Sequence, residues 1–180
     1  MEEIKFSVKM QVKTMYRFLM HHGYAGMSGI INLIISGGAL VLLIAGFGES
    51  VTSKVALAIV AALFTVINPL YLYYKAAKQV KLTPMFANPL DYVVSDGGLT
   101  VSQGEETLTV EWGELRKVVE TKKDFYVYLS LTRAYIFPKE NLKGLEGAFR
   151  AAVKSHTKPA VCKCRFYGGT GQEQAGDSRK

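Results

Sequence analysis

Two long apolar runs, Ile30–Phe47 and Val55–Tyr74, lie on either side of a short polar break, and neither contains Asp, Glu, Lys or Arg. A helix rises about 1.5 Å per residue, so about 20 apolar residues cross the roughly 30 Å of bilayer hydrocarbon. Helices in water usually keep one polar face, whereas these runs are apolar around their circumference. We therefore expect two transmembrane helices, 30–47 and 55–74, arranged as a hairpin; a buried hairpin in a soluble protein is the less favoured interpretation.

Small residues within the two runs predict where the helices touch. Glycine and alanine allow helix backbones to approach closely in membranes. The predicted helix-packing positions are Gly37, Gly38, Ala58 and Ala62.

The pair Asn68-Pro69 interrupts the second run near its end. Proline lacks a backbone N–H, and the Asn68 amide lies close to the carbonyl that this frees. Two interpretations stay open, a hinge or polar site within the bilayer and a tolerated kink near the interface. The tyrosines that follow, Tyr71, Tyr73 and Tyr74, are typical of the headgroup layer.

Basic residues flank the apolar runs on the outside of the predicted hairpin. Lys5, Lys9, Lys13 and Arg17 come before it, whereas the connection carries Lys54 and Glu49. Lys75, Lys78 and Lys81 follow it, as predicted contacts for anionic lipid. Both termini are therefore expected in the cytoplasm, with the chain multi-pass in the inner membrane and without a cleaved signal peptide. The formal charge of +7 fits anionic lipid better than nucleic acid.

The rest of the chain has the alternating pattern of short strands. Expected strands are Asp91–Ser95, Leu99–Gln103, Thr107–Trp112, Leu115–Thr121, Asp124–Leu131 and Ala134–Phe137, with a further strand from Ile4 to Met10. In the third of these, Leu108, Val110 and Trp112 are expected to face the core. The strands are followed by a predicted helix from Leu142 to about Ser155.

This order of elements predicts four regions. Residues 1–29 hold the first strand and an amphipathic juxtamembrane helix, 30–74 the membrane hairpin, 75–156 a β-rich cytoplasmic domain with its helix, and 157–180 a disordered tail. The fold class expected from the residues is α+β, with the hairpin inserted in one domain.

Several segments resemble the YcxB-like family of bacterial membrane proteins. These are Tyr92–Val101, a tryptophan-led strand at Glu111-Trp112, the pattern Val-x-Glu-Thr within Leu115–Glu120 and the next residue, the aromatic strand Phe125–Tyr128, and the exit Ile136-Phe137-Pro138-Lys139. The resemblance extends over roughly Ile4 to Val153. It implies a seven-stranded, pleckstrin-homology-like antiparallel β-barrel with a C-terminal capping helix, and no agreed enzymatic activity.

Candidate chemistry is sparse in this sequence. Cys162 and Cys164, with His156 nearby, form the sharpest candidate for a zinc or redox site, but one cysteine pair is half of a four-ligand set. His21 and His22 are adjacent and point about 100° apart on a helix. We therefore expect no catalytic residue, no metal and no cofactor.

Three functions follow as hypotheses. The favoured one is a membrane-anchored, non-catalytic interaction module that binds a partner protein or lipid at the inner leaflet. The second is an accessory subunit of a membrane transporter that docks through its helices. The third, a hydrolase or redox enzyme using Cys162, Cys164 or His156, is the least favoured.

Overall fold

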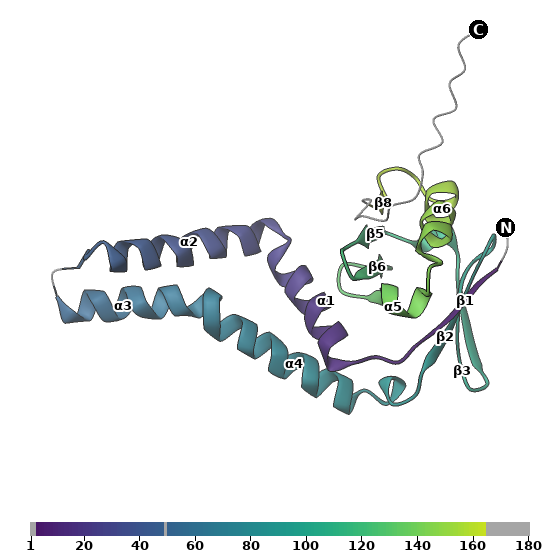
Figure 1. Ribbon diagram of the computed structural model, residues 1–180, viewed down its shortest axis with the longest axis horizontal. Helices are drawn as coiled ribbons and strands as arrows, with labels where there is room; N and C mark the ends of the chain where they lie inside the picture. The colour runs from purple at the N-terminus through teal and green to yellow at the C-terminus, as the bar shows by residue number, and fades with distance from the viewer. Residues whose placement is uncertain (1–2, 49, 165–180) are drawn as a thin grey trace, which may run out of the picture. The chain divides into compact units, whose positions relative to one another are not determined.

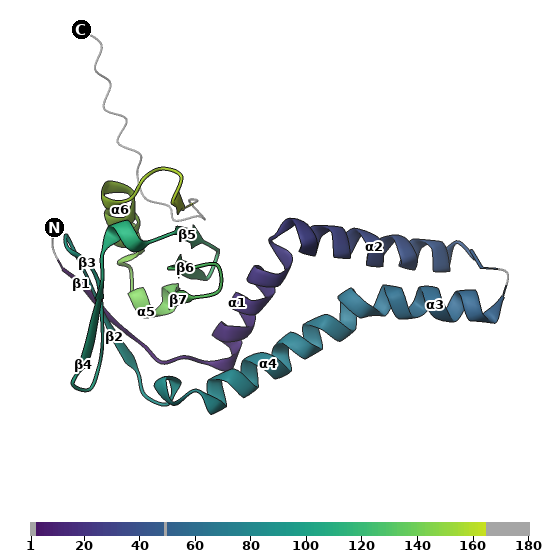
Figure 2. The ribbon, with the colours of Figure 1, turned by 180° about the vertical axis from the view of Figure 1, so that it is seen from behind.

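The computed structural model describes residues 3–48 and 50–164 (Figures 1 and 2). The chain divides into two compact units. Among the described residues, the helical unit lies within 5–92 and 101–108, and the β-rich unit comprises residues 3–4, 93–100 and 109–164.

The helical unit is built from α1 (Val12–Tyr24), α2 (Met27–Ile44), α3 (Val51–Ala62), the π-helical segment η1 (Leu63–Ile67) and α4 (Asn68–Leu82). The last three form one continuous helix of 32 residues. Within this unit α2 lies beside α3, and α1 lies beside α4 (Figure 1).

The prediction of two membrane-spanning helices needs correction. Val51–Leu82 is by itself long and apolar enough to cross a membrane, judged by length and composition. The helices that come before it in the chain, Val12–Tyr24 and Gly29–Ile44, meet the same criterion only when they are taken together, and they are bent by 83° relative to one another. Among the described residues, one helix therefore qualifies alone, because the chain turns sharply between α1 and α2.

The first sheet has the strand order β1-β2-β3-β4. Its strands are β1 (Ile4–Val8), β2 (Leu90–Ser95), β3 (Gly98–Gln103) and β4 (Glu106–Val110). A short 3-10 turn, η2 (Pro84–Phe86), precedes β2. The expected pairing of the N-terminal strand with the later strands is confirmed, and the rings of Phe6 and Tyr92 stack across it at 5.4 Å.

The second sheet has the order β7-β6-β5-β8. It consists of β5 (Lys117–Glu120), β6 (Asp124–Tyr128), β7 (Ala134–Pro138) and β8 (Cys162–Lys163). β6 is antiparallel to both neighbours, whereas β8 runs parallel to β5. All five residues of β6 are buried, which makes this strand the centre of the β-rich unit. β8 lies within the segment predicted as a disordered tail, whose residues 165–180 lie outside the described part of the chain.

The predicted C-terminal helix is divided into α5 (Lys139–Leu142) and α6 (Glu146–His156). Lys143 and Gly144, which separate them, both have positive φ angles of 48° and 92°. This backbone conformation ends a helix, and it is common for glycine there. Phe149 of α6 packs edge-on against Phe125 and Phe137 at 5.0 and 5.6 Å and so attaches α6 to the second sheet.

The predicted seven-stranded, pleckstrin-homology-like barrel is wrong, because the described strands form two open sheets of four strands each. The chain leaves β4 at Val110 and enters a 3-10 turn, η3 (Trp112–Glu114), so β5 pairs with β6 and β8 and not with β4. Trp112 is buried as expected, and its indole N–H donates to the Ser95 carbonyl at 3.0 Å. Leu108, expected in the core, is 59% exposed.

Candidate functional site

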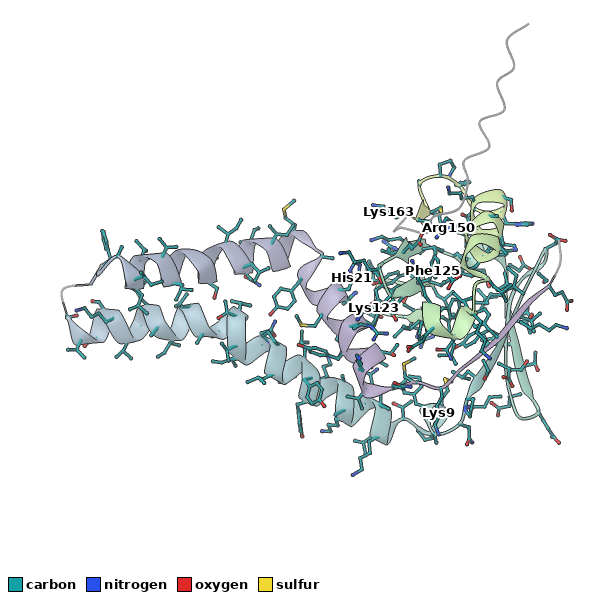
Figure 3. The ribbon with its side chains drawn as sticks, viewed as in Figure 1. Lys9, His21, Lys123, Phe125, Arg150 and Lys163 are labelled. Atoms are coloured by element: carbon teal, nitrogen blue, oxygen red, sulfur yellow. The ribbon has the colours of Figure 1, made fainter. Side chains whose placement is uncertain are left out.

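Beyond the first turn of α3, where Thr52, Ser53 and Lys54 are exposed, the outward surface of α2 and α3 is largely apolar (Figure 3). Within the most apolar 18-residue stretch of the long helix, 6% of the residues are buried. Soluble monomers rarely expose one contiguous apolar surface of this kind. Exposed large hydrophobic residues on α2, α3 and η1 include Ile30, Ile31, Ile34, Ile35, Val41, Val55, Ile59, Leu63 and Ile67. These side chains therefore require an apolar surrounding that the chain itself does not supply.

The contact between α2 and α3 is made by small residues. Ser36, Ala39 and Ala61 are buried there. The Ser36 hydroxyl donates toward two carbonyl oxygens of the facing helix, that of Ala61 at 2.6 Å and that of Val60 at 3.1 Å. One polar side chain is thus fully satisfied inside an otherwise apolar contact.

The four predicted packing residues differ in their exposure. Gly38 and Ala58 are exposed, and Gly37 and Ala62 are partly buried. A methyl group added at Gly37 or Gly38 meets no other atom within 4 Å. Gly38 and Ala58 therefore lie on the outward surface, and Gly37 makes no close contact within the described part of the chain.

The π-helical segment η1 leaves a backbone carbonyl without its usual partner. The N–H of Asn68 bonds to the carbonyl of Leu63, five residues earlier. In the same register, the Phe64 carbonyl falls opposite Pro69, which has no N–H. Tyr24 occupies this position, since its hydroxyl donates to the Phe64 carbonyl at 2.8 Å.

Asn68 completes this arrangement. Its side-chain N–H donates to the Tyr24 oxygen at 2.9 Å. We call Tyr24, the Phe64 carbonyl and Asn68 the polar joint. Because Tyr24 is the last residue of α1, the joint ties the 83° bend between α1 and α2 to the π-helical segment of the long helix. π-helical insertions of this kind are frequent at functional positions.

Gly29 allows the bend to form. A methyl group at this position would lie 2.6 Å from Tyr24 Cα and would also overlap the Gly23 carbonyl oxygen. Both obstacles are backbone atoms, which cannot swing aside. Glycine is therefore required here by close approach.

The lysines predicted to contact anionic lipid all lie on α4. Lys75, Lys78 and Lys81 are exposed, as are Tyr71 and Tyr74 one turn earlier. They follow the polar joint directly along the same continuous helix.

Of the candidate metal and redox residues, Cys162 and Cys164 are neighbours, whereas His156 makes other contacts. His156 stacks on Trp112 at 5.1 Å between ring centres, and its Nε2 lies 3.3 Å from Asp96 Oδ1. Burial, together with the neighbouring Cys162, raises the pKa of Cys164 to about 12, so its thiol is protonated at neutral pH. No three His, Cys, Asp or Glu side chains in the described ranges are placed to hold a metal.

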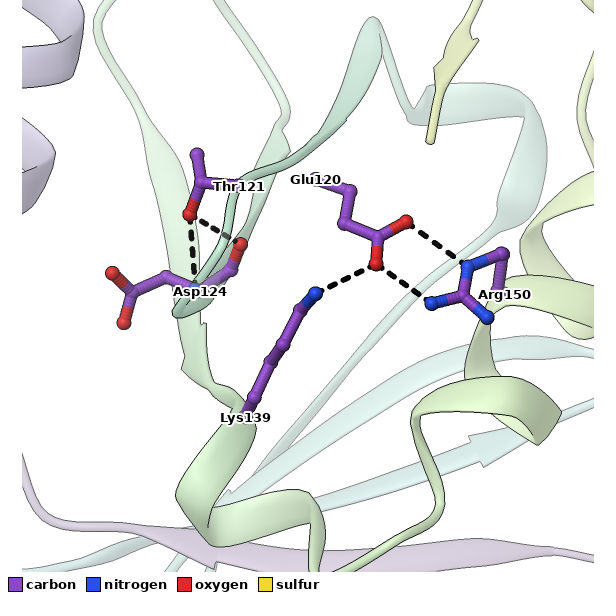
Figure 4. A network of polar contacts seen from close by, with 5 residues as sticks. All are labelled: Glu120, Thr121, Asp124, Lys139 and Arg150. Carbon is purple, nitrogen blue, oxygen red and sulfur yellow. Dashed lines mark hydrogen bonds and ion pairs between the residues drawn. The ribbon is translucent and has the colours of Figure 1, made fainter. Parts of the chain in front are cut away.

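A buried carboxylate joins three elements of the β-rich unit (Figure 4). The Glu120 side chain is 0% exposed and accepts hydrogen bonds from Lys139 at 2.7 Å and from Arg150 at 2.7 and 3.0 Å. Burial acts to raise the pKa of Glu120, but the hydrogen bonds from Arg150 and Lys139 outweigh it, so the net pKa lies below the usual value. The charge is fully paired and therefore serves to cross-link β5, α5 and α6.

Sequence reasoning missed the pairing of these residues and of the joint. Glu120 belongs to the Val-x-Glu-Thr pattern and Lys139 to the Ile-x-Pro-Lys exit. Both residues were therefore noted in the sequence, but the ion pair between them was not predicted. Asn68 was noticed, but its partner Tyr24 is 44 positions away. Such long-range partners leave no periodic signal in one sequence.

Comparison with known families gives one match. The family model described as YcxB-like protein matches residues 94–153, which confirms the resemblance over that segment. The matched segment contains all three residues of the Glu120 cross-link, whereas α1, α2, α3 and α4 lie outside it. Neither the curated proteins nor the solved structures give a match.

Proposed function

We propose that this chain, with its YcxB-like segment, is a multi-pass membrane-anchored interaction module without catalytic activity. In this proposal the long helix crosses the bilayer and α2 lies beside it, so that the flanking segments meet on the cytoplasmic side of a bacterial inner membrane. The observation that carries the proposal is the apolar outward surface of α2 and α3.

Helix lengths support this placement. The 18 residues of α2 rise about 27 Å, close to the roughly 30 Å thickness of bilayer hydrocarbon. Any residue of α3 in lipid brings α2 with it, because the two helices lie against one another. The Ser36 hydroxyl and the Ala61 carbonyl bond to one another inside this contact, so neither polar group faces lipid.

The distribution of basic residues supports the orientation. Lys13 and Arg17 precede α2, and Lys75, Lys78 and Lys81 follow the polar joint, whereas the connection between α2 and α3 is followed by Lys54 alone. Basic residues near span ends concentrate on the cytoplasmic side.

Open sheets support binding of a protein partner. In the described first sheet, β4 pairs with β3 on one side, and four of its five residues are exposed, so its other edge is open. An edge strand offers backbone N–H and carbonyl groups that an added strand can pair with. We propose strand addition at such an edge as the mode of partner binding.

Cysteine accessibility in intact bacterial cells tests the proposed topology. In a background with Cys162→Ser and Cys164→Ser, one variant carries Thr52→Cys and a matched variant carries Glu105→Cys. The proposal expects a membrane-impermeant maleimide to label Thr52→Cys in intact cells, and to label Glu105→Cys only after the membrane is permeabilised. Equal labelling of both in intact cells, or protection of both until lysis, would contradict it.

An accessory role for a transporter is the second candidate function. It is favoured by the exposed position of Gly38 and Ala58, which leaves small residues on the outward surface of the helix pair. Replacing both by Leu is expected to remove a copurifying membrane protein while α2 and α3 stay paired. Unchanged copurification excludes this docking surface.

A further inference from the structure

The outward side of α4 combines tyrosine and lysine in one stripe. At about 100° per residue, Tyr71, Tyr74, Lys75, Lys78 and Lys81 cluster on one side of the helix. The opposite side faces α1, since Ala76 is fully buried and the ring of Tyr73 contacts that of Tyr16 at 5.6 Å. We call these five residues the tyrosine–lysine face; all five are exposed.

The polar joint indicates where this face lies relative to lipid. A span of 32 residues would rise about 48 Å, well beyond the hydrocarbon thickness of roughly 30 Å. The part that lies before the joint, α3 with η1, rises about 25 Å and matches that thickness. The joint thus falls at the boundary between hydrocarbon and headgroups, and α4 begins in the headgroup layer.

The charge around this boundary has one sign. Neither α1 nor α4 contains Asp or Glu, while together they hold Lys13, Arg17, Lys75, Lys78 and Lys81. Within the described part of the chain, no carboxylate is paired with the three lysines of α4. Their ammonium groups are therefore available to an external anion.

We infer that the tyrosine–lysine face binds the headgroups of anionic phospholipids and holds α4 at the bilayer surface. Lysine supplies positive charge to the lipid phosphate, and tyrosine is suited to the interface because its ring is apolar and its hydroxyl is polar. This inference rests on the membrane placement proposed above. It adds a preference among lipids that membrane anchoring alone does not require.

Quenching by brominated lipid tests the preference. The full chain, in the background with both cysteines replaced by serine, carries a fluorophore at Gln79→Cys beside the face and is reconstituted in nanodiscs. One set contains 20 mol% phosphatidylglycerol brominated near its headgroup, and the other contains the same fraction of brominated phosphatidylcholine. Each well-placed lysine near an anionic surface contributes about a five-fold preference, so several-fold stronger quenching by the anionic lipid is expected.

Charge-neutral and charge-conserving variants assign the preference to this face. Lys75→Gln with Lys78→Gln and Lys81→Gln should remove it, whereas the three Arg substitutions should keep it. Lys122→Gln with Lys123→Gln, in the turn between β5 and β6, is the matched control for lost charge and should keep it as well.

Two outcomes would overturn the inference. These are equal quenching by the two lipids and a preference that survives the triple Gln substitution. Failure of the membrane placement itself is distinguishable, because a second fluorophore at Ile59→Cys would then escape quenching by lipids brominated in mid-chain.

Discussion

The helical unit and the second sheet satisfy their polar groups in opposite ways. In the helical unit, large apolar side chains point outward, and the hydroxyls of Ser36, Tyr24 and Thr65 donate to backbone carbonyls of α3 and η1. In the second sheet, aromatic side chains point inward and the buried Glu120 is neutralised by two cations. In the proposed placement, the first region faces lipid and the second faces water.

Outward exposure consequently has a different meaning in each unit. An exposed leucine beside the second sheet is an ordinary surface residue in water. An equally exposed isoleucine on α3 is one of many such residues, and their joint exposure marks a surface that contacts a membrane or a protein partner. Four substitutions test this contrast, each with a matched control.

The largest effect is expected at Glu120. Glu120→Gln leaves Lys139 and Arg150 facing a neutral amide, and breaking a buried ion pair in this way costs about 3–5 kcal/mol of unfolding free energy. Urea unfolding in detergent, followed by the emission of Trp112, the single tryptophan, measures the loss. Glu140→Gln, on a neighbouring exposed position, is the control. An unchanged midpoint would show that the cross-link is not stabilising.

Glu120 also makes the β-rich unit sensitive to acid. Its pKa is lower in the folded chain than in the unfolded one, so the carboxylate contributes stability that is fully present above the unfolded pKa of about 4.3. That contribution is lost as the pH falls through the lower folded value. The difference in unfolding free energy between the parent chain and Glu120→Gln should therefore shrink on acidification below about pH 4.3. A constant difference down to pH 2 would contradict the ion-pair assignment.

A charge on the helix surface is expected to have the next largest effect. Ile59 is 55% exposed, and Ile59→Asp should cost about 2.5–3.5 kcal/mol of insertion free energy if this position lies in hydrocarbon. Leu131, 67% exposed in the β-rich unit, is the control, and Leu131→Asp should be tolerated. The amount of each variant in washed membranes is the measurement. Equal recovery would indicate that both surfaces face water.

Two glycines give a sharper comparison within α2. Gly29→Ala forces a methyl group against the backbone of Gly23 and Tyr24 and should cost about 1–3 kcal/mol, typical of overpacking. Gly38→Ala meets no atom within 4 Å and should be neutral or slightly stabilising. SDS titration, followed by energy transfer between dyes on outward positions of α1 and α4, measures both. Similar midpoints would remove the role of Gly29 in the bend.

The smallest effect is expected from the polar joint. Tyr24→Phe removes the donor to the Phe64 carbonyl and the acceptor for Asn68, which should cost about 1 kcal/mol. Tyr71→Phe removes an exposed hydroxyl on the same helical unit and should change the SDS midpoint by less. If Tyr71→Phe has the larger effect, the joint does not stabilise the bend.

Local elements could be predicted from the sequence, while their partners could not. Alternation placed β2, β3, β6 and β7 within a few residues of their observed bounds, because alternation is a property of the strand itself. Closure of a barrel depends on which strands pair, and this is not visible in alternation. The 3-10 turn at Trp112–Glu114 ends the first sheet at β4, although the alternating pattern continues to Trp112. Leu108 was misplaced for the same reason, since its strand lies at the edge of an open sheet.

The candidate site shows the same limit. Apolar composition identified the helical segment, and the lysines of α4 were found exposed where they were expected. Packing through Gly37 and Gly38 was expected from residue size, but the rotation of each helix about its axis is set by tertiary contacts. Those contacts place Ser36 between the helices, where its hydroxyl donates toward the carbonyl oxygens of Val60 and Ala61.

Extraction of native membranes tests the central claim, that the helix Val51–Leu82 crosses the bilayer with α2 beside it. Membranes that contain the full chain are washed with alkaline carbonate, which strips peripheral proteins, and are then treated with detergent. The account predicts that the chain stays in the membrane pellet after carbonate and is released by detergent. Release into the carbonate supernatant would contradict it.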